Sequence, residues 1–175
     1  MPRVSTMTWN GDQLFASKKH DWGTPQHVFD HFNKIYNYGL DAAATEGNAK
    51  CEKYITPEQD SLRVDWASEY PEVGSVWLNP PYGRGLGAWM KKCHDQADKG
   101  LIVSALVMAR TDTRWWHDWC MRAAHVWLVK GRIRFVGPDG VPGNSAPAPS
   151  ALVVWKYPSY WPTHPPIFRT CEISR

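Results

Sequence analysis

An asparagine, two prolines and a tyrosine follow one another at residues 79–82, directly after an apolar run. Each proline lacks a backbone N–H and has a fixed φ, so this turn cannot pair within a sheet and leaves its carbonyl groups as acceptors. The side-chain oxygen of Asn79 and the carbonyl of Pro80 could together accept both protons of an exocyclic amino group. Such an amine is a weak nucleophile because its lone pair is delocalised into the ring. Two acceptors favour the pyramidal nitrogen that can attack a methyl sulfonium.

Tyr82 adds an aromatic ring that could hold a flat base by stacking, a contact that stabilises binding by about 1–3 kcal/mol. The alternative for this motif is a tight proline turn with a packed tyrosine. The apolar strand that runs straight into Asn79, and the acidic residues upstream of it, disfavour that alternative. We therefore predict that the catalytic residues for methylation of an amino group are Asn79, Pro80, Pro81 and Tyr82.

The surrounding sequence predicts strands that alternate with helices. Thr24 is predicted to cap a helix whose first residue is Pro25 and whose apolar stripe continues to Tyr36. Further helices are predicted over residues 86–97 and 112–122. Strands are predicted at residues 40–41, 75–78, 101–108, 125–129, 131–135 and 151–155. This alternation predicts an α/β sandwich around a mainly parallel sheet.

Two polar residues stand at the carboxyl ends of predicted strands. Asp41 ends the first strand, and Asn79 directly follows the second. Ligands of open α/β sheets bind outside the carboxyl ends of the strands. The predicted fold and the proline motif therefore indicate the same site.

The composition predicts one domain with two flanking segments. A chain of 175 residues is in the usual size range for one core. Residues 1–21 are predicted to be a polar N-terminal arm, residues 22–156 the domain, and residues 157–175 a C-terminal tail. Within the domain, residues 137–150 are rich in Gly, Pro and Ser and are predicted to form a long mobile loop.

Several classes of protein are disfavoured by the composition. Hydrophobic residues make up 43% and charged residues 21%, and no apolar run approaches the length of about 18 residues that a membrane helix needs. The first residues lack the pattern of a secretory signal, so a cytoplasmic location is expected. The four cysteines form no C-x-x-C pair, so neither a metal site nor a disulfide framework is predicted.

The net charge of +3 conceals an uneven distribution along the chain. Residues 41–79 contain eight acids and three bases, whereas residues 84–134 contain ten bases and four acids. This division suggests an acidic region for a cationic small molecule beside a basic region for a polyanion, although the charges could also simply solvate the surface.

The chain resembles a known family over residues 22–156. Six blocks carry the resemblance: Trp22–Pro25, Leu40–Ala44, Asp60–Leu62 with Asp65–Trp66, Leu78–Tyr82, Ala109–Thr113 with Trp115, and Gly131–Phe135. Together they resemble the Rossmann-like, S-adenosylmethionine-dependent amino-methyltransferases, and within them the small phage-type DNA adenine methyltransferases. The Asn-Pro-Pro-Tyr block alone is shared with methylases of protein glutamine and of RNA guanine.

The resemblance implies S-adenosylmethionine as cofactor and a set of residues that bind it. Thr24 and Pro25 would lie beside its methionine end, where a helix N-terminus suits a carboxylate. Asp41 would face the cationic methionine portion. Asp60 and Asp65 are candidates for the ribose hydroxyls or the adenine amine, and the sequence does not rank them. The full set predicted to bind cofactor is Trp22, Thr24, Pro25, Asp41, Ala42, Asp60 and Asp65; the usual glycine-rich turn after the first strand is replaced by residues 42–44, all alanine.

The resemblance also implies double-stranded DNA as the partner of a monomer or weak dimer, without membrane or metal. Arg110, Arg114, Arg132 and Arg134 suit phosphates or a guanine edge, although each could be an ordinary surface charge. The target base would be extruded from the duplex. Two alternatives stay open: an amino-methyltransferase of RNA or protein glutamine, and a non-catalytic nucleic-acid-binding module. The recognition sequence and the biological role are not predicted.

Overall fold

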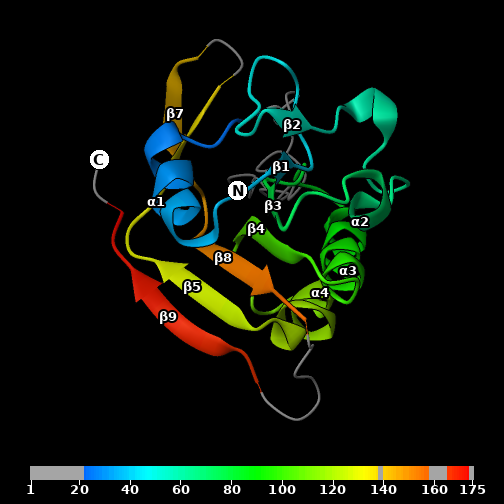
Figure 1. The fold of residues 1–175 in the computed structure, drawn as a ribbon. Coiled ribbons are helices and arrows are strands. Elements are labelled where there is room, and N and C mark those ends of the chain that lie inside the picture. Colours follow the sequence, from blue (N-terminus) through cyan, green and yellow to red (C-terminus); the bar gives the residue numbers. More distant parts are fainter. Residues whose placement is uncertain (1–21, 138–139, 158–164, 174–175) are drawn as a thin grey trace, which may run out of the picture.

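The computed structural model describes residues 22–137, 140–157 and 165–173 (Figure 1). The predicted N-terminal arm, residues 1–21, lies outside this part of the chain. The strands are β1 (Leu40–Asp41), β2 (Lys53–Tyr54), β3 (Ser75–Leu78), β4 (Ile102–Met108), β5 (His125–Val129), β6 (Arg134–Val136), β7 (Pro142–Ser145), β8 (Ser150–Trp155) and β9 (Ile167–Cys171). The helices are α1 (Gln26–Tyr36), α2 (Trp66–Glu69), α3 (Leu86–Ala97) and α4 (Arg114–Asp118), with 3₁₀ turns η1 (Pro57–Gln59) and η2 (Cys120–Arg122).

One sheet dominates the described residues, with seven strands in the order β2-β1-β3-β4-β8-β5-β9. Strands β2, β1, β3 and β4 are mutually parallel, and β9 is parallel to β5. Only β8 runs the other way, between β4 and β5. The prediction of an α/β fold with a mainly parallel sheet is therefore confirmed, and the carboxyl ends of β1, β3 and β4 meet at one edge.

Both faces of this sheet are covered, so its central strands are mainly apolar, with one buried serine in each of β3, β4 and β8. Helix α1 lies on one face, and α3 with α4 on the other (Figure 1). The sheet has a hydrophobic core on each face, and alternate residues of β3 point into one core or the other. Val76 and Leu78 pack in the same core as Met90 of α3, whereas Trp77 packs with Phe29 of α1. This period of two explains why 75–78 and 101–108 are continuous apolar runs in the sequence.

Helix α1 confirms the prediction from the apolar stripe, but its start is displaced by one residue. Pro25 occupies the N-cap position and the helix begins at Gln26, so Thr24 does not cap it. Thr24 is instead buried, and its Oγ1 has no hydrogen-bond partner among the described residues. Helix α3 matches its predicted bounds. The helix predicted over 112–122 is broken into α4 and η2, because Trp119 between them has non-helical dihedral angles (φ −125°, ψ −46°).

Residues 137–150 are not a continuous loop as predicted. Strand β7 pairs antiparallel with β6 and forms a hairpin whose turn includes Gly140 at φ 78°. On its other side β6 pairs with Gly23, through hydrogen bonds in both directions with Val136 (2.8 and 2.9 Å). Pro, Gly and Asn in β7 have low strand propensity. The strand is thus formed by its pairing with β6 and not by its own composition.

The predicted C-terminal tail also contributes to the sheet. Strand β9 pairs with β5 over five residues and forms one edge of the sheet. No alternation of apolar and polar residues marks this strand in the sequence, because Ile167 and Phe168 are neighbours in the chain. In the structure both side chains are exposed. Residues 167–171 of the predicted tail are thus part of the main sheet. No helix in the described ranges is long and apolar enough to span a membrane.

Candidate active site

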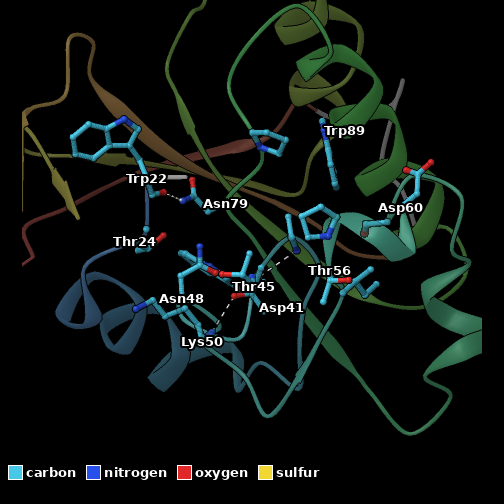
Figure 2. A pocket seen from close by; sticks show the side chains of 18 residues that line it. Trp22, Thr24, Asp41, Thr45, Asn48, Lys50, Thr56, Asp60, Asn79 and Trp89 are labelled. Atoms are coloured by element: carbon cyan, nitrogen blue, oxygen red, sulfur yellow. Dashed lines mark hydrogen bonds between the residues drawn. The ribbon is translucent and has the colours of Figure 1, made fainter. Parts of the chain in front are cut away.

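A cavity of about 290 Å³ opens at the carboxyl ends of β1 and β3 (Figure 2). Five segments surround it: the stretch before α1, the turn after β1, the segment from Ile55 to Ser61, the proline motif, and Trp89 of α3. Its lining residues are Trp22, Gly23, Thr24, Asp41, Ala43, Ala44, Thr45, Asn48, Lys50, Ile55, Thr56, Pro57, Asp60, Ser61, Trp77, Asn79, Pro81 and Trp89. The cavity lies where the sequence predicted a site.

Asn79 of the proline motif has a fixed side-chain orientation. Its Nδ2 donates a hydrogen bond to the main-chain carbonyl of Trp22 (2.9 Å). Its Oδ1 is buried and has no partner in the part of the chain that the structure describes. A buried amide oxygen without a donor is costly. Asn79 therefore brings a desolvated, unused acceptor to the cavity wall, as the amine-binding prediction requires.

The other members of the motif are placed less uniformly. Pro81 lines the cavity, whereas Pro80 and Tyr82 do not. The Tyr82 hydroxyl donates to the main-chain carbonyl of Leu106 in β4 (3.2 Å), and its ring meets the edge of Phe135 in β6 (6.2 Å between centroids). Burial raises the pKa of this hydroxyl. Tyr82 is thus held between the main sheet and the hairpin, and stacking on a target base stays a prediction.

Asp41 is a buried carboxylate in the cavity, with only 3% of its surface exposed. It accepts hydrogen bonds from the backbone N–H groups of Ala43 (3.3 Å) and Lys50 (3.0 Å). Burial raises its pKa to about 6, although these two N–H groups and the positive charge of Lys50 act in the opposite direction. A buried carboxylate of this kind is stabilised by a cationic ligand.

The turn after β1 corrects one predicted contact. Ala42 is fully buried and belongs to the core, because its N–H donates to the carbonyl of Trp77 and so continues the sheet. Ala43 and Ala44 line the cavity instead. Of the other predicted cofactor residues, Trp22 and Thr24 line the cavity, and Pro25 is buried as the N-cap of α1 without lining it.

Lys50 is a lining residue that sequence reasoning missed. Burial lowers the pKa of its ammonium, and the nearby Asp41 carboxylate raises it. Its Nζ donates to Oε1 of Gln26 in the first turn of α1 (3.1 Å). A single lysine in an acidic stretch carries no sequence signal for a site. Its position depends on the turn that returns the chain to Asp41.

The segment from Thr56 to Ser61 supplies the far wall of the cavity. Thr56 and Gln59 form a reciprocal capping box around η1, and Asp60 follows it with a left-handed backbone (φ 54°). The Ser61 hydroxyl and carbonyl accept from the Trp66 indole N–H (2.9 and 3.0 Å). The spacing Thr-x-x-Gln is the signal in the sequence that could have predicted this turn.

The structure separates the two acids that the sequence left unranked. Asp60 lines the cavity and pairs with the exposed Arg63 (3.0 Å). Asp65 lies outside the cavity and pairs with Lys99 after α3 (2.5 Å), which lowers its pKa to about 2. Asp65 therefore joins α2 to the end of α3, outside the cavity, and its role in cofactor binding stays a prediction.

This difference gives a matched pair of variants. Asp60→Asn should weaken cofactor binding by about tenfold, or roughly 1.4 kcal/mol, because it removes a carboxylate from the cavity wall. Asp65→Asn should leave the affinity within about twofold and act only on stability. Calorimetry on both proteins measures the contrast. Equal losses of affinity would show that the cavity does not define the binding site.

Comparison with known proteins decides the family. A family model described as DNA N-6-adenine-methyltransferase (Dam) matches residues 11–164. The DNA N-6-adenine-methyltransferase of Haemophilus phage HP1 is 31% identical over 145 residues, which cover 80% of each chain. That of Escherichia phage T1 is 34% identical over 127 residues, covering 71% of this chain and 51% of the phage protein.

The chain belongs to the DNA N-6-adenine-methyltransferase family. This membership confirms the family indicated by the sequence blocks, and it confirms adenine-specific methylation of DNA over the alternatives on RNA or protein glutamine and over a non-catalytic module. It also identifies the amine that the acceptor at Asn79 would meet as N6 of adenine.

The four predicted DNA-binding arginines of this methyltransferase lie in two segments. Arg110 and Arg114 follow β4 and pair with Asp112 (3.9 Å) and Asp118 (3.4 Å) respectively. Arg132 and Arg134 are exposed in and before β6. Residues 146–149 connect the two segments, because Pro149 accepts a hydrogen bond from the backbone of Ala109 and Ala146 accepts one from the Arg132 guanidinium.

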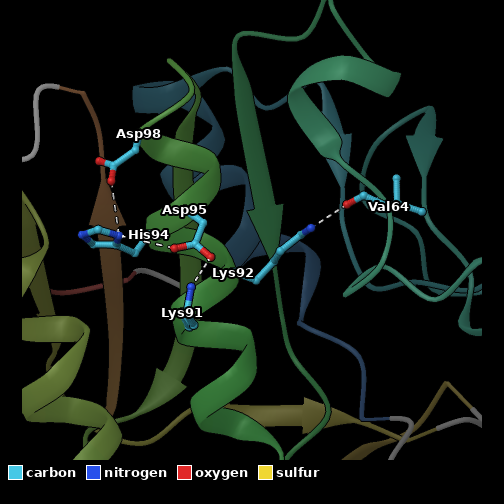
Figure 3. Close-up of polar contacts among 6 residues, drawn as sticks. All are labelled: Val64, Lys91, Lys92, His94, Asp95 and Asp98. Carbon is cyan, nitrogen blue, oxygen red and sulfur yellow. Dashed lines mark hydrogen bonds and ion pairs between the residues drawn. The ribbon is translucent and has the colours of Figure 1, made fainter.

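Several bases in the basic half of the methyltransferase are already engaged elsewhere. On the outer face of α3, Lys91 pairs with Asp95 (2.6 Å) and Lys92 donates to the carbonyl of Val64 (2.6 Å; Figure 3). His94 lies 3.5 Å from Asp98 on the same helix. The charge count over 84–134 therefore overstates the positive surface that is available to a polyanion.

Proposed function

We propose that this methyltransferase moves the methyl group of S-adenosylmethionine to N6 of an adenine extruded from double-stranded DNA. In this proposal the cavity at β1 and β3 holds the cofactor, and the adenine binds at the adjoining proline motif, of which Asn79 and Pro81 line the cavity. The observation that carries the proposal is the buried Oδ1 of Asn79 at the cavity wall, which has no hydrogen-bond partner among residues 22–137, 140–157 and 165–173. Family membership identifies the methyl acceptor as adenine in DNA. The cofactor and the roles of individual residues rest on the site.

The cavity fits the chemical groups of S-adenosylmethionine. Figure 2 places Thr24 and Asp60 at opposite sides of the cavity, with Asp41 between them. Thr24 Oγ1 is buried without a partner among the described residues and would bind the polar methionine end. Asp41 would hold the cationic groups, and Asp60 would accept from the ribose hydroxyls. The volume, about 290 Å³, is near the lower end of small-ligand pockets.

Trp89 is the aromatic wall nearest to Asp60 in this view (Figure 2). With Ile55 and Pro57 it forms an apolar part of the cavity. An adenine ring buries its faces well between such side chains. We therefore place the adenosine end of the cofactor at Trp89 and Asp60, and the methionine end at Thr24 and Lys50.

The residues of the chain act by positioning. When bound, the cofactor supplies an electrophilic methyl group on a sulfonium. Asn79 Oδ1 and the Pro80 carbonyl accept hydrogen bonds from the two N–H groups of the adenine amine, which orients the nitrogen for in-line attack. Once the nitrogen has gained the methyl group, it loses one proton to water. Pro81 shapes the turn, and Tyr82 holds the base. A base inside a stacked duplex is out of reach of this cavity, so the adenine must leave the helix.

Methyl incorporation tests the function. The purified protein is incubated with S-adenosylmethionine labelled in its methyl group and with DNA, RNA or a glutamine-rich protein. Label is expected in DNA alone, as N6-methyladenine after hydrolysis, together with an upward shift of the melting temperature by the cofactor. Label in RNA or protein but not in DNA would overturn the proposal. Absence of both label and thermal shift would leave only a binding module.

DNA binding by the arginines gives a further prediction. If Arg110, Arg132 and Arg134 contact phosphates, each substitution to alanine should reduce the slope of log affinity against log salt by roughly one. Arg169→Ala is the matched control. Arg169 lies in β9, the edge strand of the sheet, and its guanidinium lies 5.4 Å from the centroid of the Trp127 ring in β5. Fluorescence titration at several salt concentrations measures the slopes. Unchanged slopes for all three would place the DNA path elsewhere.

A further inference from the structure

Trp22 lies between Asn79 and the β6–β7 hairpin. Its carbonyl accepts the hydrogen bond from Asn79 Nδ2 (2.9 Å). The next residue, Gly23, pairs in both directions with Val136 of β6. The indole ring of Trp22 lies against Gly143 of β7. A Cβ at position 143 would lie 2.4 Å from Cζ3 and 2.7 Å from Cη2 of this ring. The indole thus fills the space where a side chain at position 143 would begin.

An amide side chain has an oxygen and a nitrogen of nearly equal size, and only its partners decide which one faces a given group. A main-chain carbonyl accepts hydrogen bonds and cannot donate them. The Trp22 carbonyl therefore selects Nδ2 and leaves Oδ1 of Asn79 as the unused acceptor. Rotation of the amide would place two oxygens against each other and remove that acceptor from the cavity.

We propose that Trp22 is a positioning residue through which the β6–β7 hairpin sets the orientation of the Asn79 amide. The backbone of Gly23, the next residue, is held by β6, and the Trp22 indole is held by the space that Gly143 leaves. The hairpin also carries Arg134, which we expect to contact DNA. The same hairpin would therefore contact the DNA and orient Oδ1 of Asn79, the hydrogen-bond acceptor. The inference rests on the proposed function, because it assigns the hairpin a role in methyl transfer.

The first test adds one methyl group at the contact. Gly143→Ala should displace the indole and with it the Trp22 carbonyl, and so lower the single-turnover rate at saturating cofactor and DNA by about tenfold. In a protein that already carries Asn79→Ala, the same change should lower the rate by less than about twofold, since its target is gone. Gly74→Ala is the matched control, because a Cβ at that position meets no atom within 4 Å.

A second pair of variants tests the indole contact itself. Trp22→Phe removes Cζ3 and Cη2, the two atoms nearest to a Cβ at position 143, and leaves only the milder contact with the main-chain oxygen of Phe135 at 3.3 Å. The double variant Trp22→Phe with Gly143→Ala should therefore recover most of the rate that Gly143→Ala loses. A melting temperature within a few degrees of the parent shows that each protein is folded.

Two results would overturn this inference. One is a Gly143→Ala protein that is folded and has the parental rate. The other is a Gly143→Ala effect of equal size with and without Asn79, which would mean that the hairpin acts independently of the amide. Failure of the proposed function is a different result, since Asn79→Ala alone would then keep the parental rate.

Discussion

Asn79→Ala should lower the single-turnover rate of methyl transfer by about 10²–10³, while the affinity for S-adenosylmethionine stays within about twofold. The change removes one of two acceptors for the adenine amine but leaves the proline-fixed turn in place. An interaction made mainly in the transition state lowers kcat and kcat/KM together. The hydrogen bond to Trp22 is also lost, but it lies at one side of the cavity, away from Asp60 and Trp89.

Rapid-quench assays with labelled cofactor measure this rate, and calorimetry measures the affinity. Asn79→Asp is the informative companion. The carboxylate still accepts a hydrogen bond from the amine, so activity should be measurable. It cannot donate a hydrogen bond to the Trp22 carbonyl, as Nδ2 of Asn79 does, so the rate should fall below that of the parent. If Asn79→Ala methylates DNA at nearly the parental rate, the mechanism proposed for this cavity is wrong.

The parts of the fold that could be predicted are those with strong local signals. The apolar run before Asn79 and the stripe after Pro25 each specify an element from within a few residues, and β3 and α1 follow them. Because parallel strands end at one edge, placing Asp41 and Asn79 at two strand ends was enough to predict that they lie close together. Both residues line the cavity.

The parts that could not be predicted depend on contacts distant in sequence. Strand β7 exists because β6 and Gly23 pair beside it, although its own residues favour a loop. Asp60 and Asp65 are the same residue type in similar sequence surroundings, so the sequence alone does not distinguish them. Their different positions become apparent only from the ion pair of Asp65 with Lys99, which is 34 residues away in the chain. Lys50 reaches the cavity only because its N–H returns to Asp41. Such pairings are set by the assembled fold, so no local pattern reports them.

Asp41 should make cofactor binding depend on pH in a defined direction. Burial raises its pKa to about 6 from an ordinary 3.8. Above pH 6 the carboxylate is ionised and ready for a cation, whereas below pH 6 a proton must leave before the cation binds. The affinity of the parent should therefore fall by about tenfold between pH 7 and pH 5. Binding near pH 6 should release protons, which calorimetry in buffers of different ionisation enthalpy detects.

Asp41→Asn removes the charge that this argument needs. At pH 7.5 it should bind S-adenosylmethionine at least tenfold more weakly than the parent, by about 1.4 kcal/mol or more. Its affinity should then change little down to pH 5, where the two proteins converge. Asp60 and Lys50 also line the cavity, but both are retained in the variant, so the difference between the two pH profiles reports Asp41 alone.

The stability of the cofactor-free protein gives an independent check on the same carboxyl group. A folded pKa above the unfolded value means that the folded state binds the proton more tightly between pH 4 and 6. The stability that protonation of Asp41 contributes is thus present at low pH and is lost as pH rises through about 6. The parent should gain up to about 3 kcal/mol from this group between pH 7 and pH 4, relative to Asp41→Asn under the same conditions. Denaturant unfolding across this range measures the free energy of unfolding of both proteins. If the two free energies change with pH in parallel, Asp41 is not a buried carboxyl group with a raised pKa, and the argument for its binding a cation fails.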